Sequence, residues 1–195
     1  LKADTGQIFH AGADITKTTE EQRTTFLARV FQDPKLGTAP RMTVAENMLL
    51  ASKRGEKRHL MPRRLKQRMA EFTKLAAQMN NGLENRMTTP TGALSGGQRQ
   101  ALSFLMATLK RPDILLLDEH TAALDPHTAR NLLHATNQRI TEDHLTALMI
   151  THHMEDALKY GNRLIVLKDG QIKADYNAAE KAQLTVDDLY AYFEM

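Results

Sequence analysis

The spacing of apolar residues divides the chain into a helical middle part and flanking parts in which strands and helices alternate. In the middle part, residues 33–111, apolar positions recur three and four apart among charged ones, as in amphipathic helices. Thr43 followed by Glu46 is a capping box, and Asn80-Asn81-Gly82 is a sequence that ends a helix. Helices are expected at residues 44–50, 62–79 and 96–109, and a further one at 20–30, before Pro34.

Beyond Pro112, short apolar runs alternate with amphipathic stretches, which is typical of a parallel sheet with crossover helices. The run Ile114-Leu115-Leu116-Leu117 predicts a strand buried on both faces, and Asp169-Gly170 predicts a hairpin turn. Strands are expected at residues 7–10, 114–117, 146–151, 163–168 and 171–175, and helices at 126–140, 154–160 and 185–193. The predicted fold is α/β, with a mostly parallel sheet in a core lobe (residues 1–32 and 112–195) and an inserted helical subdomain (33–111).

Composition narrows the class of protein. A chain of 195 residues with 42% hydrophobic and 25% charged residues fits a soluble globular domain, and a net charge of +3 is mild. The absence of cysteine excludes a disulfide scaffold and fits a reducing compartment. No apolar run approaches the roughly 18 residues that span a bilayer, so a membrane role is expected to come through a partner.

A run of basic residues is the one strong charge feature. It comprises Lys53, Arg54, Lys57, Arg58, Arg63, Arg64, Lys66 and Arg68. No aromatic residue interleaves it, so it offers no platform for stacking bases, and no nucleic-acid partner is expected. A solvated helix face is the favoured interpretation, and contact with lipid headgroups or a membrane protein is the second.

Two carboxylates follow the buried strand. Asp118 and Glu119 should emerge at the carboxyl edge of the sheet, where α/β proteins bind ligands. Asp118 suits Mg²⁺, which takes few carboxylates and keeps its waters. Glu119 can polarise a water for in-line attack on a γ-phosphate. The alternative is a strand that simply ends in two solvated acids.

Three further segments add to this chemistry. Ser95-Gly96-Gly97-Gln98 opens a helix whose N–H groups and dipole favour an anion, although a plain serine cap is the alternative. Gln32, after an apolar run, offers a neutral amide to Mg²⁺ and the attacking water. His152, at the end of the strand 146–151, can donate to a γ-phosphate oxygen, and His153 is expected to face the other way.

In this order, the segments resemble the Q-loop (Gln32), signature (residues 94–98), Walker B strand (114–119), D-loop (124–126) and switch histidine (His152) of ABC transporter ATPases. The resemblance covers nearly the whole chain. It implies a P-loop NTPase-like core and a head-to-tail dimer that hydrolyses MgATP at its interface. By this resemblance the residues that act in trans, from the second subunit, are Ser95, Gly97 and Gln98; those that act in cis are Gln32, Asp118, Glu119 and His152; Gly96 and Asp125 join the nucleotide site.

The resemblance also implies partners and a place in the cell. These are a transmembrane permease, a second ATPase subunit and a substrate-binding protein, at the cytoplasmic face of the membrane. The sequence around these motifs, including Phe31-Gln32-Asp33-Pro34 and residues 118–125, is similar to that of a bacterial subgroup of these ATPases linked to aromatic-amino-acid uptake. An importer of amino acids or similar small solutes is therefore expected. The alternatives are a soluble ABC ATPase of translation or DNA repair, and a non-hydrolysing pseudo-subunit.

Departures from the family pattern qualify this expectation. His120 stands where the family has proline, and Ala123 where serine is frequent. The sequence contains no G-x-x-x-x-G-K-[ST] phosphate loop, which in the family lies before Thr5-Gly6. The chain as written is therefore expected to be N-terminally truncated and not to hydrolyse ATP at a useful rate.

Overall fold

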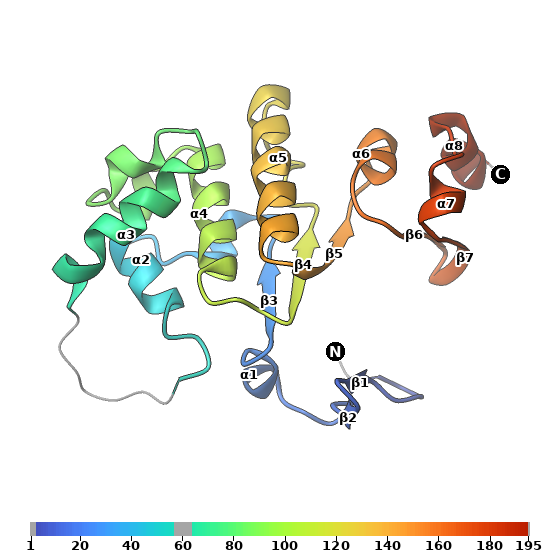
Figure 1. Ribbon diagram of the computed structural model, residues 1–195, viewed down its shortest axis with the longest axis horizontal. Helices are drawn as coiled ribbons and strands as arrows, with labels where there is room; N and C mark the ends of the chain where they lie inside the picture. The colour runs from blue at the N-terminus through green and yellow to red at the C-terminus, as the bar shows by residue number, and fades with distance from the viewer. Residues whose placement is uncertain (1–2, 57–63, 195) are drawn as a thin grey trace. The chain divides into compact units, whose positions relative to one another are not determined.

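The computed structural model describes residues 3–56 and 64–194 (Figure 1). The chain forms two compact units, Leu1–Leu148 and Met149–Met195. The division into a core lobe and a helical subdomain at residues 33–111 stays a prediction.

A parallel pair of strands is the centre of the first unit. Strand β3 (Leu27–Val30) pairs in parallel with β4 (Ile114–Asp118), and β5 (Thr146–Ile150) follows β4 in the sheet order. On β4, Leu115 and Leu117 are fully buried, and the alternate residues Ile114, Leu116 and Asp118 are half-buried. The predicted strand at 114–117 is confirmed, with one face buried more completely than the other.

The predicted helix at residues 20–30 is wrong beyond its first turn. Helix α1 (Glu20–Arg23) starts with a capping box between Thr19 and Gln22, but β3 begins at Leu27. Ala28 and Val30 point into the core, and all four residues of β3 pair with β4, which is almost ninety residues away in sequence. This non-local pairing overrides the local helical pattern.

Four longer helices complete the core of the first unit. They are α2 (Val44–Ala51), α3 (Leu65–Ala77), α4 (Gly96–Thr108) and α5 (Pro126–Glu142). Helices α2, α3 and α4 pack together around fully buried Met48, Phe72 and Phe104 (Figure 1). The capping box of Thr43 and Glu46 is confirmed. Leu50, in the last turn of α2, is 54% exposed although it is apolar.

Short elements connect these helices. The 3₁₀ helices η1 (Pro34–Gly37), η2 (Leu83–Arg86) and η3 (Thr91–Ala93) precede α4. Near the N-terminus, β1 (Phe9–His10) pairs antiparallel with β2 (Ala13–Asp14), so the strand expected at 7–10 forms only in its second half.

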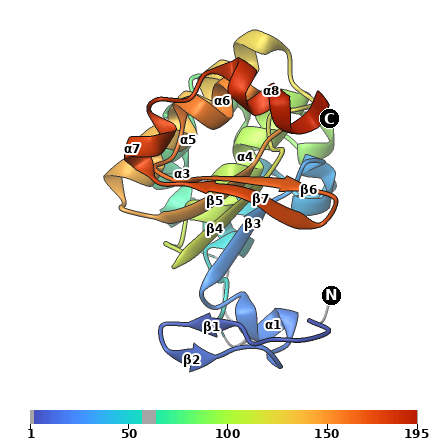
Figure 2. The same ribbon diagram turned by 90° about the vertical axis from the view of Figure 1, so that its right-hand side faces the viewer.

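The second unit is a hairpin with helices. It contains α6 (Met154–Lys159), β6 (Leu164–Lys168), β7 (Gln171–Tyr176), α7 (Ala178–Lys181) and α8 (Val186–Glu194). The hairpin is confirmed, and Asp169 and Gly170 both have the positive φ of its two-residue turn. Helices α7 and α8 pack on β7 and β6 respectively (Figure 2). Leu167 and Ile172, opposite each other in the hairpin, are exposed.

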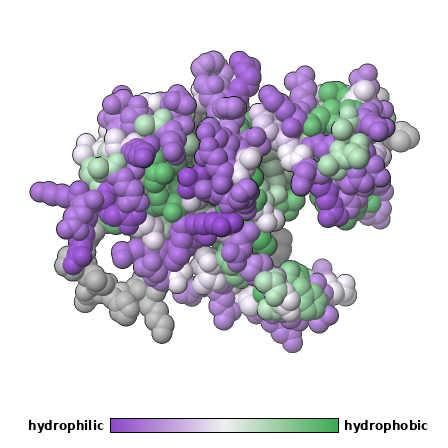
Figure 3. Space-filling view, viewed as in Figure 1, coloured by the Kyte–Doolittle hydropathy of each residue, from purple (hydrophilic) through white to green (hydrophobic). Residues whose placement is uncertain are grey.

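Only part of the basic run can be placed. Lys57, Arg58 and Arg63, and the start of the helix predicted at 62–79, lie outside the described residues. Hydrophilic side chains dominate the face shown over α3 and α5 (Figure 3). Arg54 departs from the expected solvated face, because its guanidinium donates to the carbonyls of Ala107 and Lys110 at the end of α4. None of the described helices combines the length and apolar character that crossing a membrane requires.

Candidate functional site

The side chains of Gln32 and Glu119 meet at the carboxyl ends of β3 and β4. Gln32 Nε2 donates to Glu119 Oε2 at 2.9 Å, across 87 positions of sequence. Glu119 has φ of +42°, a left-handed conformation that a side-chain-bearing residue adopts at a cost. The tight turn after β4 therefore directs this carboxylate toward the loop that follows β3. Two residues that the sequence predicted to act together lie in direct contact.

Asp118 has a partner that the sequence analysis missed. Arg29, on the neighbouring strand β3, donates to Asp118 Oδ2 at 2.5 Å, and its guanidinium lies 4.7 Å from the centre of the Phe31 ring. Both charged side chains are partly exposed, so the ion pair adds about 1 kcal/mol or less to stability, and its main effect is to orient the carboxylate. The available signal was a lone arginine within an otherwise apolar strand.

The residues at this edge fit Mg²⁺ in their chemistry. No cluster of three His, Cys, Asp or Glu side chains able to hold a metal occurs within residues 3–56 and 64–194. One carboxylate, from Asp118, and one amide oxygen, from Gln32, nevertheless suit an ion that takes few protein ligands and completes its shell with water and substrate phosphates.

The segment of residues 94–98 opens α4 as the sequence predicts. Ser95 is the N-cap: its Oγ accepts from the Gln98 N–H at 3.2 Å, and Gln98 Oε1 accepts from the Ser95 N–H at 3.3 Å. Ser95 and Gly96 are exposed, so the start of the helix and its positive dipole end face solvent. This geometry is suited to an anion.

Gly97 has a second reason to lack a side chain. A Cβ atom there would lie 2.5 Å from Thr128 Cγ2 on α5, whereas one at Gly96 would have only an ordinary contact at 3.9 Å. In the structure, Gly97 also allows the first turn of α4 to pack closely against α5.

Asp125 is the N-cap of α5. Its Oδ1 accepts from the N–H groups of His127 and Thr128 at 3.1 and 3.0 Å. The pKa of Asp125 lies below its usual value, first because of the Thr128 side chain and then because of these backbone N–H groups. The expected nucleotide-binding residue therefore has a structural role within its own chain, one turn from the contact of Thr128 with Gly97.

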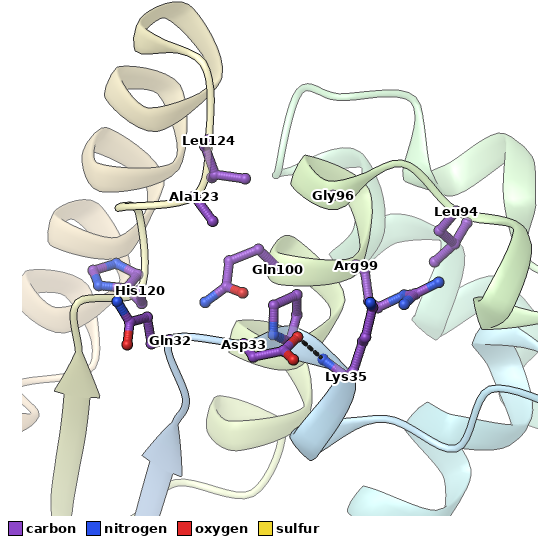
Figure 4. A pocket seen from close by; sticks show the side chains of 11 residues that line it. Gln32, Asp33, Lys35, Leu94, Gly96, Arg99, Gln100, His120, Ala123 and Leu124 are labelled. Atoms are coloured by element: carbon purple, nitrogen blue, oxygen red, sulfur yellow. Dashed lines mark hydrogen bonds between the residues drawn. The ribbon is translucent and has the colours of Figure 1, made fainter.

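A cavity of about 480 Å³ lies between the loop after β3, the start of α4 and the turn after β4 (Figure 4). Gln100 projects into it from α4; its Nε2 donates to the Phe31 carbonyl at 3.0 Å, and its Oε1 has no partner among the described residues. His120 is 2% exposed, its Nε2 also lacks a described partner, and burial lowers its pKa to about 4. The imidazole is therefore neutral at physiological pH. Sequence reasoning gave neither residue a role.

His152 belongs to the second unit. It is exposed in the turn between β5 and α6, and its ring centre lies 4.4 Å from that of His153, at 34°. The expectation that the two rings face apart is wrong. Strand β5 ends at Ile150, so the alternation of side chains along a strand no longer applies at these positions.

Comparisons with known proteins identify the family. A family model described as "ABC transporter" matches residues 1–122, more than half of the chain. The chain belongs to the ABC transporter family. The tyrosine transport ATP-binding protein of Clostridioides difficile (strain R20291) is 41% identical over 194 residues, which are the whole of this chain and 77% of that protein. The thiamine import ATP-binding protein ThiQ of Escherichia coli O157:H7 is 32% identical over 172 residues, 88% of this chain and 69% of that one.

Solved ABC structures share the fold. A dimeric ATP-binding cassette in a post-hydrolysis state with ADP and Pi superimposes with a TM-score of 0.74, at 24% identity, over 91% of this chain and 75% of that one. The predicted α/β ABC fold is confirmed. Membership makes the chain an ATP-binding subunit of an ABC transporter, a class of ATP-hydrolysing enzymes. The residues around Gln32 resemble the Q-loop of this family and residues 94–98 its signature, and they carry those names.

Proposed function

We propose that this ABC subunit energises a membrane importer of amino acids or similar small solutes. The whole-chain similarity to a tyrosine transport subunit supports the amino-acid class, and the similarity to a thiamine import subunit supports the direction. The partners in this proposal are a transmembrane permease, a second ATPase subunit and a substrate-binding protein, with the ATPase peripheral at the cytoplasmic face. The observation that carries the proposal is the contact between Gln32 and Glu119.

In the proposed reaction Glu119 is the general base. Its carboxylate orients a water, takes a proton from it as the oxygen attacks the γ-phosphorus, and the bond from phosphorus to the bridging oxygen of ADP breaks. Gln32 holds the carboxylate through the 2.9 Å hydrogen bond, so movement of the Q-loop would also move the base. Asp118 and Gln32 would hold Mg²⁺, which when bound neutralises charge on the phosphates.

The remaining site residues are proposed to act at the subunit interface and at the γ-phosphate. Ser95, Gly96, Gly97 and Gln98 present a helix start to the nucleotide of the second subunit, and the exposure of Ser95 and Gly96 supports this role. Asp125 would shape the same interface through the start of α5. His152 would donate to a γ-phosphate oxygen.

ATP hydrolysis by the assembled transporter, prepared with a form of this subunit that carries a phosphate loop, tests the proposal here and in the assays below. Glu119→Gln removes the base while keeping a side chain that can bond to Gln32, and should lower kcat about 100-fold or more. Glu20→Gln, at the exposed start of α1, is the matched control and should leave kcat unchanged. Full hydrolysis by Glu119→Gln would contradict the assigned base. Uptake of labelled tyrosine that is unaffected by loss of this subunit would contradict the cargo class.

A further inference from the structure

The turn between α3 and η2 is fastened to the signature by two hydrogen bonds that run in opposite directions. Asn81 Nδ2 donates to the Gly97 carbonyl at 3.4 Å. Gln98 Nε2 donates to the Asn81 carbonyl at 3.2 Å. Asn81 Oδ1 in turn accepts from the Leu83 N–H at 3.2 Å, which fixes the asparagine side chain to its own turn. A loop 16 positions upstream therefore contacts the first turn of α4 through both its main chain and a side chain.

The Gln98 amide is engaged at both ends within its own chain. Its Oε1 completes the capping box with the Ser95 N–H, and its Nε2 reaches Asn81. The resemblance to the family assigned Gln98 a contact with nucleotide in trans. In this structure its side-chain hydrogen bonds connect the serine at the start of α4 to the Asn81 turn. Gln98 is half-buried, whereas Ser95 is exposed.

The turn at Asn81 has a specific backbone conformation and a buried neighbour, so it can hold the signature in place. Asn80 and Gly82, on either side, have φ of +50° and +76°, so the chain reverses tightly here. Leu83, directly after it, is fully buried. The turn is thus anchored in the core on one side and bonded to the signature on the other.

We propose that Asn81 is a positioning residue for the signature: through Gly97 and Gln98 it sets the direction in which Ser95 and the first N–H groups of α4 face the nucleotide. This inference rests on the proposed function, since positioning matters only if the signature contacts ATP. Asn81 itself touches no nucleotide in this scheme. Its removal therefore lowers kcat and leaves the KM for ATP within about twofold of wild type.

Two variants separate positioning from a purely structural role in the turn. Asn81→Asp keeps the oxygen that accepts from the Leu83 N–H but loses the donor to the Gly97 carbonyl; Asn81→Ala loses both. Each should lower the kcat of the assembled ATPase about fivefold, which corresponds to one net hydrogen bond. If Asn81 only stabilised its own turn, Asn81→Asp would keep the kcat of wild type, and that result would overturn the proposal.

Controls match each variant. Asn85→Ala removes an exposed asparagine side chain whose amide donates to the neighbouring Glu84, and Asn137→Asp adds the same charge on the exposed side of α5. Both should keep wild-type kcat. Glu119→Gln in the same assay reports on the proposed function, so normal hydrolysis by that variant would count against the ATPase assignment and not against Asn81.

Amide hydrogen exchange supplies a readout that needs no ATP. In Asn81→Asp, exchange should rise about fivefold in the peptide covering residues 94–99. It should stay unchanged in α2, because the bonds of Asn81 among the described residues run to Gly97, Gln98 and Leu83. Unchanged exchange at residues 94–99 would show that the turn does not hold the signature and would overturn the proposal, whatever the activity.

Discussion

A single added methyl group at Gly97 tests how the signature packs against α5. In Gly97→Ala the new Cβ would lie 2.5 Å from Thr128 Cγ2, whereas its distances to Thr128 Cβ and Oγ1, 3.7 and 3.9 Å, are ordinary contacts. One methyl group therefore causes the whole clash. Relief to 3.4 Å needs a movement of 3.4 − 2.5 = 0.9 Å. Threonine in a helix has few χ1 choices, so rotation of the Thr128 side chain offers little relief.

The expected coupling energy between these two positions is about 1–3 kcal/mol, the usual cost of overpacking a well-packed site. Gly97→Ala also gains up to about 1 kcal/mol of helix propensity, so its own effect on stability understates the clash. Thr128→Ser removes Cγ2 and keeps the hydroxyl. In the Thr128→Ser background, Gly97→Ala should become neutral or stabilising, by about 0.5–1 kcal/mol.

Urea unfolding of wild type, both single variants and the double variant gives the coupling energy directly. Gly96→Ala is the matched control, because a Cβ there meets only an ordinary 3.9 Å contact with Leu124 Cδ2, and it should not couple to Thr128→Ser. Additive effects of Gly97→Ala and Thr128→Ser, within about 0.5 kcal/mol, would refute the packing argument.

Two further predictions concern the turn after β4 and the start of α5. The free energy of unfolding of Glu119→Gly should exceed that of Glu119→Ala by about 1 kcal/mol, because φ of +42° strains any residue with a Cβ. Equal stabilities of the two variants in urea unfolding would show that this backbone conformation is not retained. The pKa of Asp125 is lowered in the folded state, so its charged form stabilises the fold. This contribution is complete above the unfolded pKa of 3.8 and is lost as pH falls through the folded pKa. The stability of wild type should therefore fall more than that of Asp125→Asn between about pH 5 and about pH 2.5, and parallel curves would contradict the assignment of the cap.

Local hydrogen bonding explains what was predicted well from the sequence. The capping box of Thr43 with Glu46 spans three residues, so its geometry follows from the residue types and the start of a helix. The helix start at residues 95–98 was predicted as well, and the structure adds that Gln98 completes a capping box with Ser95. The Asp169-Gly170 hairpin is determined in the same way, by residues that tolerate positive φ. The order of the motifs was also sufficient to indicate the family, which the comparisons confirm.

Non-local contacts explain the errors and omissions. The helix expected at residues 20–30 gives way to β3 because hydrogen bonds to β4 outweigh a short local pattern. The opposition of Arg29 and Asp118 depends on the alignment of two strands about ninety residues apart, which residue spacing does not encode. The burial of His120 likewise depends on elements that pack around the turn after β4, and the residue type alone indicates nothing of it.

The sequence by itself determined the family, the starts of α2, α4, α5 and α6, and the identity of the residues at the carboxyl end of β4, because these depend on residue types and short spacings. Only the tertiary structure decided which of them touch. It brings Gln32 within hydrogen-bond distance of Glu119, packs Thr128 against Gly97, and bonds Asn81 to the signature. The physical reason is that hydrogen bonds and steric contacts act over a few ångströms, and packing alone determines which distant segments come that close.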